Sequence, residues 1–261
     1  TFMSTHPDPG DRYNSVNQKS DEWQDSLNYA SWAVNSDNYL RMIDGLVYGE
    51  DPRQGYVESN MFYHPEMKFK YPVPPGWKLQ NSPIQVQMAP EDGKAMMIFT
   101  LARQKTLDEA VQQTLSELGL SIIESKKAVV NGMPAIWAVS QLVSQNQQTG
   151  QEQTIKVMSY FIDYNGVIYL FHGVAADADF NSYYRVFEST MVNFNRLTEV
   201  SKINVRPKRI KVQSVRRSGT LADAFKYYRV PQDQFNELAL LNNLELSDQV
   251  SSGKLIKIIG D

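Results

Sequence analysis

The stretch TIKVMSYFIDYNGVIYLFHGVA, residues 154–175, decides the fold class of this chain. Two runs rich in β-branched and aromatic residues flank the dipeptide Asn165-Gly166. That dipeptide favours the tight turn of a β-hairpin, because Asn and Gly accept a positive φ more readily than other residues. The sequence therefore predicts two antiparallel strands joined at this dipeptide.

A second hairpin is predicted upstream of the first one. SIIESKKAVV (121–130) and MPAIWAVSQLV (133–143) are separated by Asn131-Gly132, which gives the same turn signal. Further upstream, KAMMIFTLA (94–102) is continuously apolar, which is typical of a strand in the middle of a sheet. The sequence thus predicts an antiparallel sheet in the middle of the chain.

Two helices are predicted to pack on this sheet. The first begins after Thr106, whose side chain can cap it with Glu109 three residues on, and Gly119 ends it. The second carries an aromatic stripe at helical spacing, made by Phe180, Tyr183, Tyr184, Phe187, Met191 and Phe194. Strands with packed helices in this order predict an α+β fold.

The chain divides into three predicted blocks. Residues 1–58 contain short helices with narrow apolar stripes, one of which begins at Pro9 after a capping Asp8, and we expect the tail of a helical domain. Residues 59–200 contain the central antiparallel sheet. Residues 201–261 contain a linker and a small unit in the order strand, helix, helix, strand (βααβ).

Composition narrows the function classes. The chain has no cysteine, which excludes disulfides, thiolate metal sites and a cysteine nucleophile. A net charge of -3 argues against a nucleic-acid partner. No window approaches the ~20 apolar residues that a membrane span needs. We therefore expect neither nucleic-acid binding nor a transmembrane segment in this chain.

No catalytic or cofactor motif is present in the sequence. HExxH, GxSxG, the P-loop and GxGxxG are all absent. His64 precedes Pro65 in a loop, and His172 shares a strand face with Ile168 and Leu170, so both histidines are expected to have ordinary structural roles. We expect no catalytic residue and no cofactor in this chain.

Seven basic residues and no acidic one lie between Lys202 and Arg217. Lys and Arg often protect exposed strand edges, so a solvated linker and edge strand is the interpretation that we favour. The alternative is contact with an anionic surface such as a wall polymer or lipid headgroups.

The opening STHPDPGDR (4–12) resembles a segment that follows the catalytic helices of HtpX-type zinc metallopeptidases. DGLVYGEDPRQGYV (44–57) and FYHPEMKFKYPVPPGW (62–77) resemble the extended bacterial members of that family, in which a PsbP-like α+β domain and a LysM-like module follow the protease. An HExxH helix and a downstream Glu bind the zinc in that family. The HExxH motif and this third ligand are absent here, so the resemblance implies the non-catalytic C-terminal region of such a metallopeptidase.

The resemblance also implies roles for two residues of the opening. Ser4, Thr5, His6 and Pro7 correspond to the family's Ser/Thr-His-Pro segment, and Arg12 to its following Arg. In the full-length protein, which is expected to contain zinc, His6 would occupy the open position of the metal, and Arg12 would hold a substrate oxygen. In this chain alone His6 is expected to bind no metal. The alternative for His6 is packing against the upstream helices.

The third block resembles a LysM module. RRSGTLADAFKYYRV (216–230) stands at the family's entry to its first helix, LALLNNL (238–244) at its Leu-Asn turn, and VSSGKLIKI (250–258) at its closing segment. Ser218-Gly219 and Ser251-Ser252 depart from the family's residues. Because these loops line the sugar groove of LysM modules, the resemblance implies carbohydrate binding by Ser218, Gly219, Thr220, Asn242 and Asn243.

The function that the resemblance implies is to position or regulate the protease, with the PsbP-like domain presenting substrate. The implied partners are the chain's own upstream metallopeptidase domain and protein or peptide substrates, in the periplasm or at the cell envelope. The alternative is a stand-alone protein that binds peptidoglycan through its LysM-like module. A third class, an enzyme in its own right, would need a zinc or cofactor signal.

Overall fold

The computed structural model describes residues 9–27, 35–145 and 152–260. They form two compact units. The first, here called the split unit, combines the residues up to Leu46 with Ile210–Gly260, and the second, the sheet unit, is Val47–Arg209. The three blocks proposed in the sequence analysis are a prediction about which parts of the chain fold independently, and they stay a prediction.

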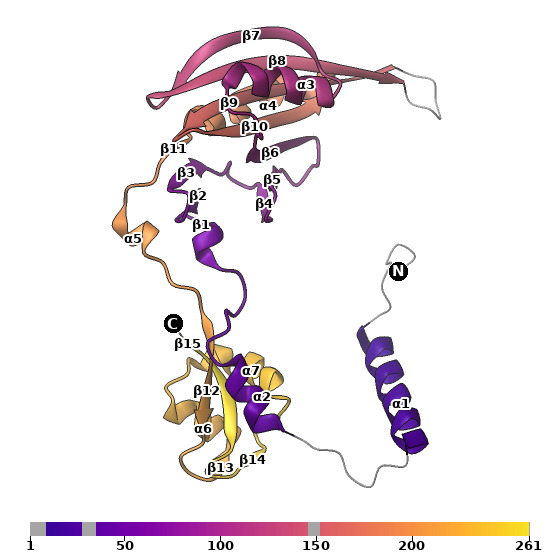
Figure 1. Cartoon of the computed structure of the whole chain (residues 1–261), viewed down its shortest axis with the longest axis vertical. Coiled ribbons are helices and arrows are strands. Elements are labelled where there is room, and N and C mark those ends of the chain that lie inside the picture. Colours follow the sequence, from indigo (N-terminus) through magenta and orange to yellow (C-terminus); the bar gives the residue numbers. More distant parts are fainter. Residues whose placement is uncertain (1–8, 28–34, 146–151, 261) are drawn as a thin grey trace. The chain divides into compact units, whose positions relative to one another are not determined.

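The sheet unit is built on a seven-stranded antiparallel sheet (Figure 1). Its strand order is β4-β5-β6-β10-β9-β8-β7. The strands are β4 (Lys78–Asn81), β5 (Val86–Ala89), β6 (Ala95–Leu101), β7 (Ser121–Val130), β8 (Met133–Gln145), β9 (Glu152–Tyr164) and β10 (Val167–Ala176). As predicted, the apolar run around β6 is an inner strand of the sheet.

Both predicted Asn-Gly hairpins are present in this sheet. Asn165 and Gly166 join β9 to β10, and Asn131 and Gly132 join β7 to β8. All four residues have a positive φ, which a type I′ turn requires of its two central residues. The turns therefore fix the register of the long strands.

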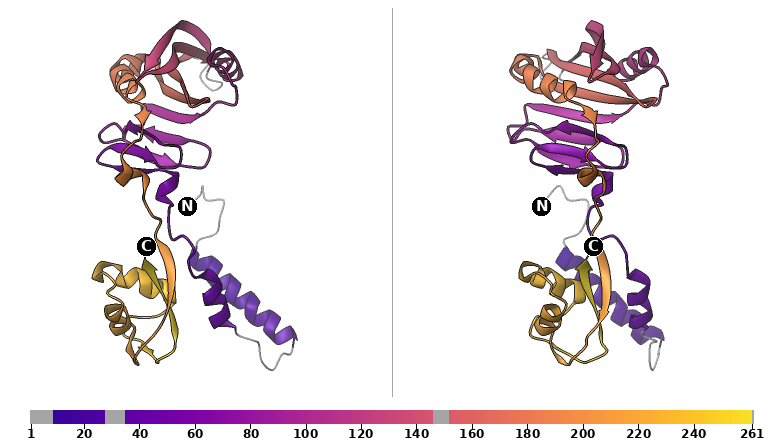
Figure 2. Two further views of the ribbon diagram at one scale, coloured as in Figure 1. Left: turned by 60° about the vertical axis from the view of Figure 1, so that its left-hand side comes forward. Right: turned by 90° about the vertical axis from the view of Figure 1, so that its left-hand side faces the viewer.

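Two helices cover opposite faces of the large sheet (Figure 2). Helix α3 (Leu107–Glu117) begins after Thr106, whose Oγ1 accepts a hydrogen bond from the Glu109 N–H at 3.3 Å, as predicted. It packs on one face together with Ile136 of β8, and helix α4 (Asp177–Val192) packs on the other face with the neighbouring Trp137. Successive strand residues point to opposite faces, so the sheet has a core on both sides.

A second, four-stranded sheet packs into the α4 side of this core. Its order is β1-β2-β3-β11, with strands β1 (Tyr56–Glu58), β2 (Met61–His64), β3 (Phe69–Pro72) and β11 (Asn195–Arg196). A 3₁₀ turn, η1 (Pro52–Gln54), precedes it, and the short helix α5 (Val200–Ile203) follows. Phe62, Phe69 and Tyr71 are buried in the shared core. The sequence did not predict this sheet.

The split unit has the predicted order strand, helix, helix, strand. Strand β12 (Arg209–Ser214) pairs with β15 (Leu255–Gly260), and β13 (Gly219–Thr220) pairs with β14 (Gln249–Val250). Helix α6 (Leu221–Tyr227) and helix α7 (Phe235–Asn242) lie between these strands in the sequence. A 3₁₀ turn, η2 (Gln232–Gln234), directly precedes α7.

Residues that precede the sheet unit complete the split unit. Helix α2 (Ser36–Ile43) packs on β15. The Asp44 Oδ1 accepts a hydrogen bond from the Val212 N–H at 2.8 Å, and the Ile210 N–H donates to the Leu46 carbonyl at 2.8 Å. The split unit is therefore assembled from two segments that the whole sheet unit separates in the sequence.

Helix α1 (Pro9–Leu27) begins at the predicted proline. Its side chains from Arg12 to Leu27 are exposed. Asp8, the predicted cap, lies outside the described residues. Among the helices that the structure describes, none has the length and apolar character needed to cross a membrane.

Candidate functional site

The sheet unit contains a cavity of about 500 Å³. Four segments line it: the turn at η1, the connection from β2 to β3, the β4–β5 hairpin and the end of β6. Its apolar lining residues are Met67, Phe69, Pro83, Ile84, Val86, Phe99 and Leu101, and its polar ones are Glu50, Asp51, Gln54, His64, Asn81, Ser82, Gln85 and Thr100. Although the polar residues are as numerous as the apolar ones, most of the surface that faces the cavity is apolar. A mostly apolar surface with some polar groups is the usual composition of a ligand site.

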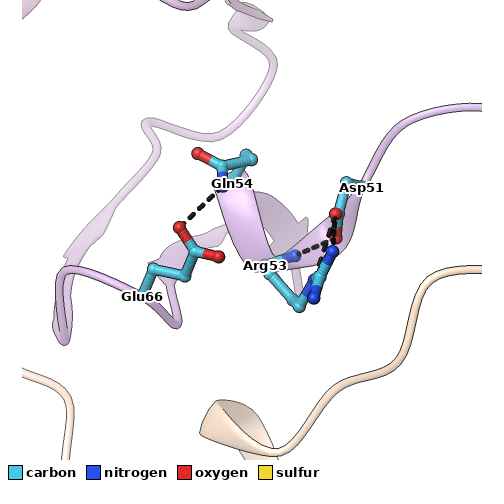
Figure 3. A network of polar contacts seen from close by, with 4 residues as sticks. All are labelled: Asp51, Arg53, Gln54 and Glu66. Carbon is cyan, nitrogen blue, oxygen red and sulfur yellow. Dashed lines mark hydrogen bonds and ion pairs between the residues drawn. The ribbon is translucent and has the colours of Figure 1, made fainter. Parts of the chain in front are cut away.

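A polar network fixes the turn that forms one side of the cavity (Figure 3). The Asp51 carboxylate accepts the Arg53 backbone N–H at 3.0 Å and forms an ion pair with the Arg53 guanidinium at 2.5 Å. Gln54 Nε2 donates to Glu66 Oε2 at 2.7 Å. The hydrogen bond from the Arg53 side chain lowers the pKa of Asp51, so this carboxylate is charged and already paired.

His64 contributes a neutral imidazole to the cavity. Its Nδ1 accepts a hydrogen bond from the Met67 N–H at 3.2 Å, so the ring proton is assigned to Nε2. Its ring centroid lies 5.0 Å from that of Phe69. Burial lowers the pKa of His64 below its ordinary value of 6.5, so the ring is uncharged at neutral pH.

Hydrogen bonds within and between the lining segments hold these segments together. Asn81 Nδ2 donates to the Gln54 carbonyl at 3.0 Å, which ties the end of β4 to η1. The Ser82 hydroxyl donates to the Gln85 carbonyl at 2.7 Å and closes the hairpin turn. Gly55 lies between these elements with a φ of 122°, where a Cβ would be 2.5 Å from Phe62 Cζ. Only glycine fits at that position.

One strand edge beside the cavity is unpaired. Strand β5 begins at Val86, which pairs with Phe99 of β6. Thr100 and Leu101 extend β6 beyond this point and pair with β10 on their other side. In the described residues no strand pairs with this end of β6 on the side of β5. The backbone groups of alternate residues point to opposite neighbours, so those of Leu101 face this side, whereas those of Thr100 face β10.

The sequence did not predict this cavity. Its lining residues are spread along the sequence from Glu50 to Leu101, and they form no recognised motif. The available signals were the turn-rich stretches DPRQG (51–55) and NSPIQ (81–85), which mark loops but do not say that the loops meet.

Of the two opening residues with implied roles, the structure describes only Arg12. His6 lies outside the described residues. Arg12 is exposed on α1. Their implied roles at a zinc centre therefore stay predictions. In the ranges that the structure describes, no three His, Asp or Glu side chains gather as metal ligands would.

The predicted carbohydrate residues of the first loop are tied to the closing loop. Ser218 Oγ accepts a hydrogen bond from the Ser252 N–H at 3.0 Å, and Gly219 pairs with Val250. Thr220 caps α6 by exchanging hydrogen bonds with Asp223. These residues hold the two loops side by side.

The other two predicted carbohydrate residues lie at the end of α7. The Asn242 amide donates to the Leu238 and Lys257 carbonyls at 2.8 Å and accepts the Lys257 N–H at 2.7 Å. Its side chain thus joins α7 to β15. Asn243 is exposed in the left-handed conformation, with a φ of 54°. Glycan binding by the five residues stays a prediction.

Comparison with known proteins found matches among solved structures. No family model matches the sequence, and no curated protein matches it. A solved structure of PsbP from the cyanobacterium Synechocystis matches with a TM-score of 0.38 and 10% identity, covering 55% of this chain and 91% of its own.

Two other solved structures match in the same way. The Ran-binding protein Mog1p from Saccharomyces cerevisiae has a TM-score of 0.39 and 14% identity, covering 56% of this chain and 99% of its own. A protein from Bacteroides thetaiotaomicron has a TM-score of 0.39 and 9% identity, covering 78% of this chain and 87% of its own. The predicted α+β class is the class observed in the structure's own helices and antiparallel sheets.

Proposed function

We propose that this chain is the non-catalytic C-terminal region of a zinc-dependent metallopeptidase, and that its sheet unit binds protein or peptide substrates for the protease. The observation that carries the binding role is the cavity of about 500 Å³ with its apolar and polar lining. The link to a metallopeptidase rests on the resemblance of STHPDPGDR (4–12) to the HtpX-type family.

The polar groups of the cavity favour binding over catalysis. A nucleophile needs an adjacent base within hydrogen-bond distance, and the base needs a free nitrogen or oxygen that faces it. Here the Ser82 hydroxyl bonds to the backbone of Gln85, and the Asp51 carboxylate is paired with Arg53. The Ser82 hydroxyl and the Asp51 carboxylate therefore shape the site, but neither is bonded to a group that would activate it as a nucleophile or base.

The test compares this chain with the longer protein that contains it. The coding sequence upstream of Thr1 is read first, and we expect an HExxH motif there. The longer protein is then expected to contain stoichiometric zinc and to degrade an unfolded protein substrate in a chelator-sensitive manner, whereas this chain alone does neither. An upstream region without the motif, or proteolysis by this chain alone, would overturn the proposal.

A second candidate function is peptidoglycan binding by the split unit. The observation that favours it is the βααβ order, together with the hydrogen-bonded pair of loops at Ser218 and Ser252. The whole chain is incubated with purified peptidoglycan, and retention is compared with that of Asn243→Ala, which changes an exposed side chain. Retention that is lost in this variant favours wall binding, and absence of retention by the unmodified chain removes this candidate.

A further inference from the structure

We propose that the cavity of the sheet unit takes an extended peptide segment, with an apolar side chain inside the cavity and a basic side chain beside Glu50. This assignment rests on the proposed binding function and names the ligand class. Three features of the cavity support it: its apolar surface, its charge and its unpaired strand edge.

The apolar surface suits a large aliphatic or aromatic side chain. Phe69, Val86 and Phe99 are buried core residues that also line the cavity. Ile84 and Leu101, which line it too, have 78% and 44% of their surfaces exposed. Covering exposed apolar surface next to an apolar cavity is favourable, because that surface is removed from water.

The charge of the cavity favours a cation. Glu50 and Asp51 are the only charged residues among those that line it. Arg53 neutralises Asp51 through their ion pair, and the imidazole of His64 is neutral. The exposed carboxylate of Glu50 is therefore left to attract a positive charge.

The unpaired edge of β6 favours a peptide over a small organic cation. Leu101 lines the cavity and, in the described residues, its backbone groups have no strand partner on the β5 side. An extended peptide can add hydrogen bonds to such an edge and place alternate side chains into the adjacent pocket. The Thr100 hydroxyl donates to the Ile84 carbonyl at 2.9 Å, which holds the hairpin next to this edge.

The experiment measures fluorescence anisotropy of a labelled, end-blocked peptide, Ala-Leu-Ala-Lys-Ala, titrated with the whole chain, because residues two apart in an extended peptide point to the same side. We expect saturable binding. Replacing the peptide's Leu by Asp is expected to weaken it by about tenfold or more, because the buried side chain is lost. Replacing its Lys by Glu is expected to weaken it about two- to fivefold, the range for an exposed ion pair, and this difference should shrink in high salt.

Two variants of the protein test the location of binding. Glu50→Lys reverses the charge of an exposed residue at the cavity and is expected to weaken binding of the Lys peptide about two- to fivefold. Glu117→Lys makes the same change of net charge at the exposed end of α3, outside the cavity lining, and serves as the control. Gln85→Trp places a larger side chain at a lining position and is expected to weaken binding at least tenfold, with folding verified by its thermal transition.

The outcomes separate this inference from the proposed function. Absence of saturable binding, or equal affinities for the unmodified protein, Glu50→Lys and Gln85→Trp, overturns the peptide assignment. Zinc-dependent proteolysis by the longer protein without peptide binding here leaves the metallopeptidase proposal in place and rejects only this inference. Peptide binding by a protein that has no metallopeptidase domain upstream would support this inference and reject the metallopeptidase proposal.

Discussion

At the scale of single residues, His172 in the middle of β10 is a buried ionisable side chain with a polar partner. Its Nδ1 lies 2.7 Å from Ser159 Oγ on the neighbouring strand, and 5% of its surface is exposed. The side chain is thus a satisfied core histidine, as its strand position predicted. Burial lowers the pKa of His172 to about 4, because a charged ring would lose its hydration there.

This pKa predicts that the chain loses stability on mild acidification. The unfolded chain binds a proton at His172 near its ordinary pKa of 6.5, whereas the folded chain does so only near about 4. The free energy of unfolding therefore falls as the pH drops through this window, by about 2 kcal/mol at pH ~5. Urea unfolding at pH ~7.5 and pH ~5 measures this difference.

The variant His172→Gln supplies the control. It is expected to be less stable than the unmodified chain at pH ~7.5, because the buried contact is altered, but to lose less stability on acidification. His64, whose pKa burial also lowers, contributes in the same direction in both proteins. Equal losses in the two proteins would show that His172 is not the group responsible.

At the scale of elements, local signals predicted the hairpins and the helices well. Thr106 and the two Asn-Gly dipeptides act within three or four residues, so their effect can be read from the sequence. Helix α3 ends at Glu117 with Leu118 as its exposed C-cap, and Gly119, the predicted end, follows directly with a positive φ of 66°.

Long-range pairing is the part that the sequence did not reveal. Strand β11 has two residues, Asn195 and Arg196, and pairs with Lys70 and Phe69 of β3. A strand that short carries no periodicity, and its partner is more than a hundred positions away in the sequence. The four-stranded sheet and the cavity beside it depend on such contacts, so neither was predicted.

The contact between α4 and β10 predicts a sensitive position at Gly173. A Cβ added there would lie 2.4 Å from Cγ of Phe187, so the helix packs directly on the backbone of the strand. Gly173→Ala is expected to lower the free energy of unfolding by about 1–3 kcal/mol, since the helix or the ring must move. Chemical denaturation measures this loss.

A double-mutant cycle shows whether Phe187 causes the effect. In a Phe187→Ala background the ring is absent, so Gly173→Ala should cost much less than it does alone. The same substitution at Gly166, whose φ is positive but whose added Cβ meets no atom within 4 Å, gives the cost of backbone strain without a clash. An unchanged cost of Gly173→Ala in both backgrounds would contradict the packing argument.

At the scale of the whole molecule, the sheet unit is an insertion in the split unit. Its two ends are adjacent within the structure, because Val47 forms a β-bridge with Arg209 and the Tyr48 N–H donates to the Lys208 carbonyl at 2.7 Å. In the split unit, the Ile210 N–H donates to the Leu46 carbonyl. Domains whose ends lie close together are commonly tolerated as insertions.

Removing the insertion is therefore expected to leave a folded split unit. Residues 1–46 joined through Asn-Gly to residues 210–261 should unfold cooperatively, because Leu46 and Ile210 are already hydrogen-bonded and a two-residue turn can connect such a pair. Residues 47–209 should also unfold cooperatively alone, since they contain both sheets and their core.

Residues 210–261 alone are the control, and they should be less stable, because α2 and the Asp44 contact to Val212 are then missing. Circular dichroism during thermal unfolding measures all three fragments. A joined fragment no more stable than residues 210–261 alone would show that the upstream segment does not belong to this unit.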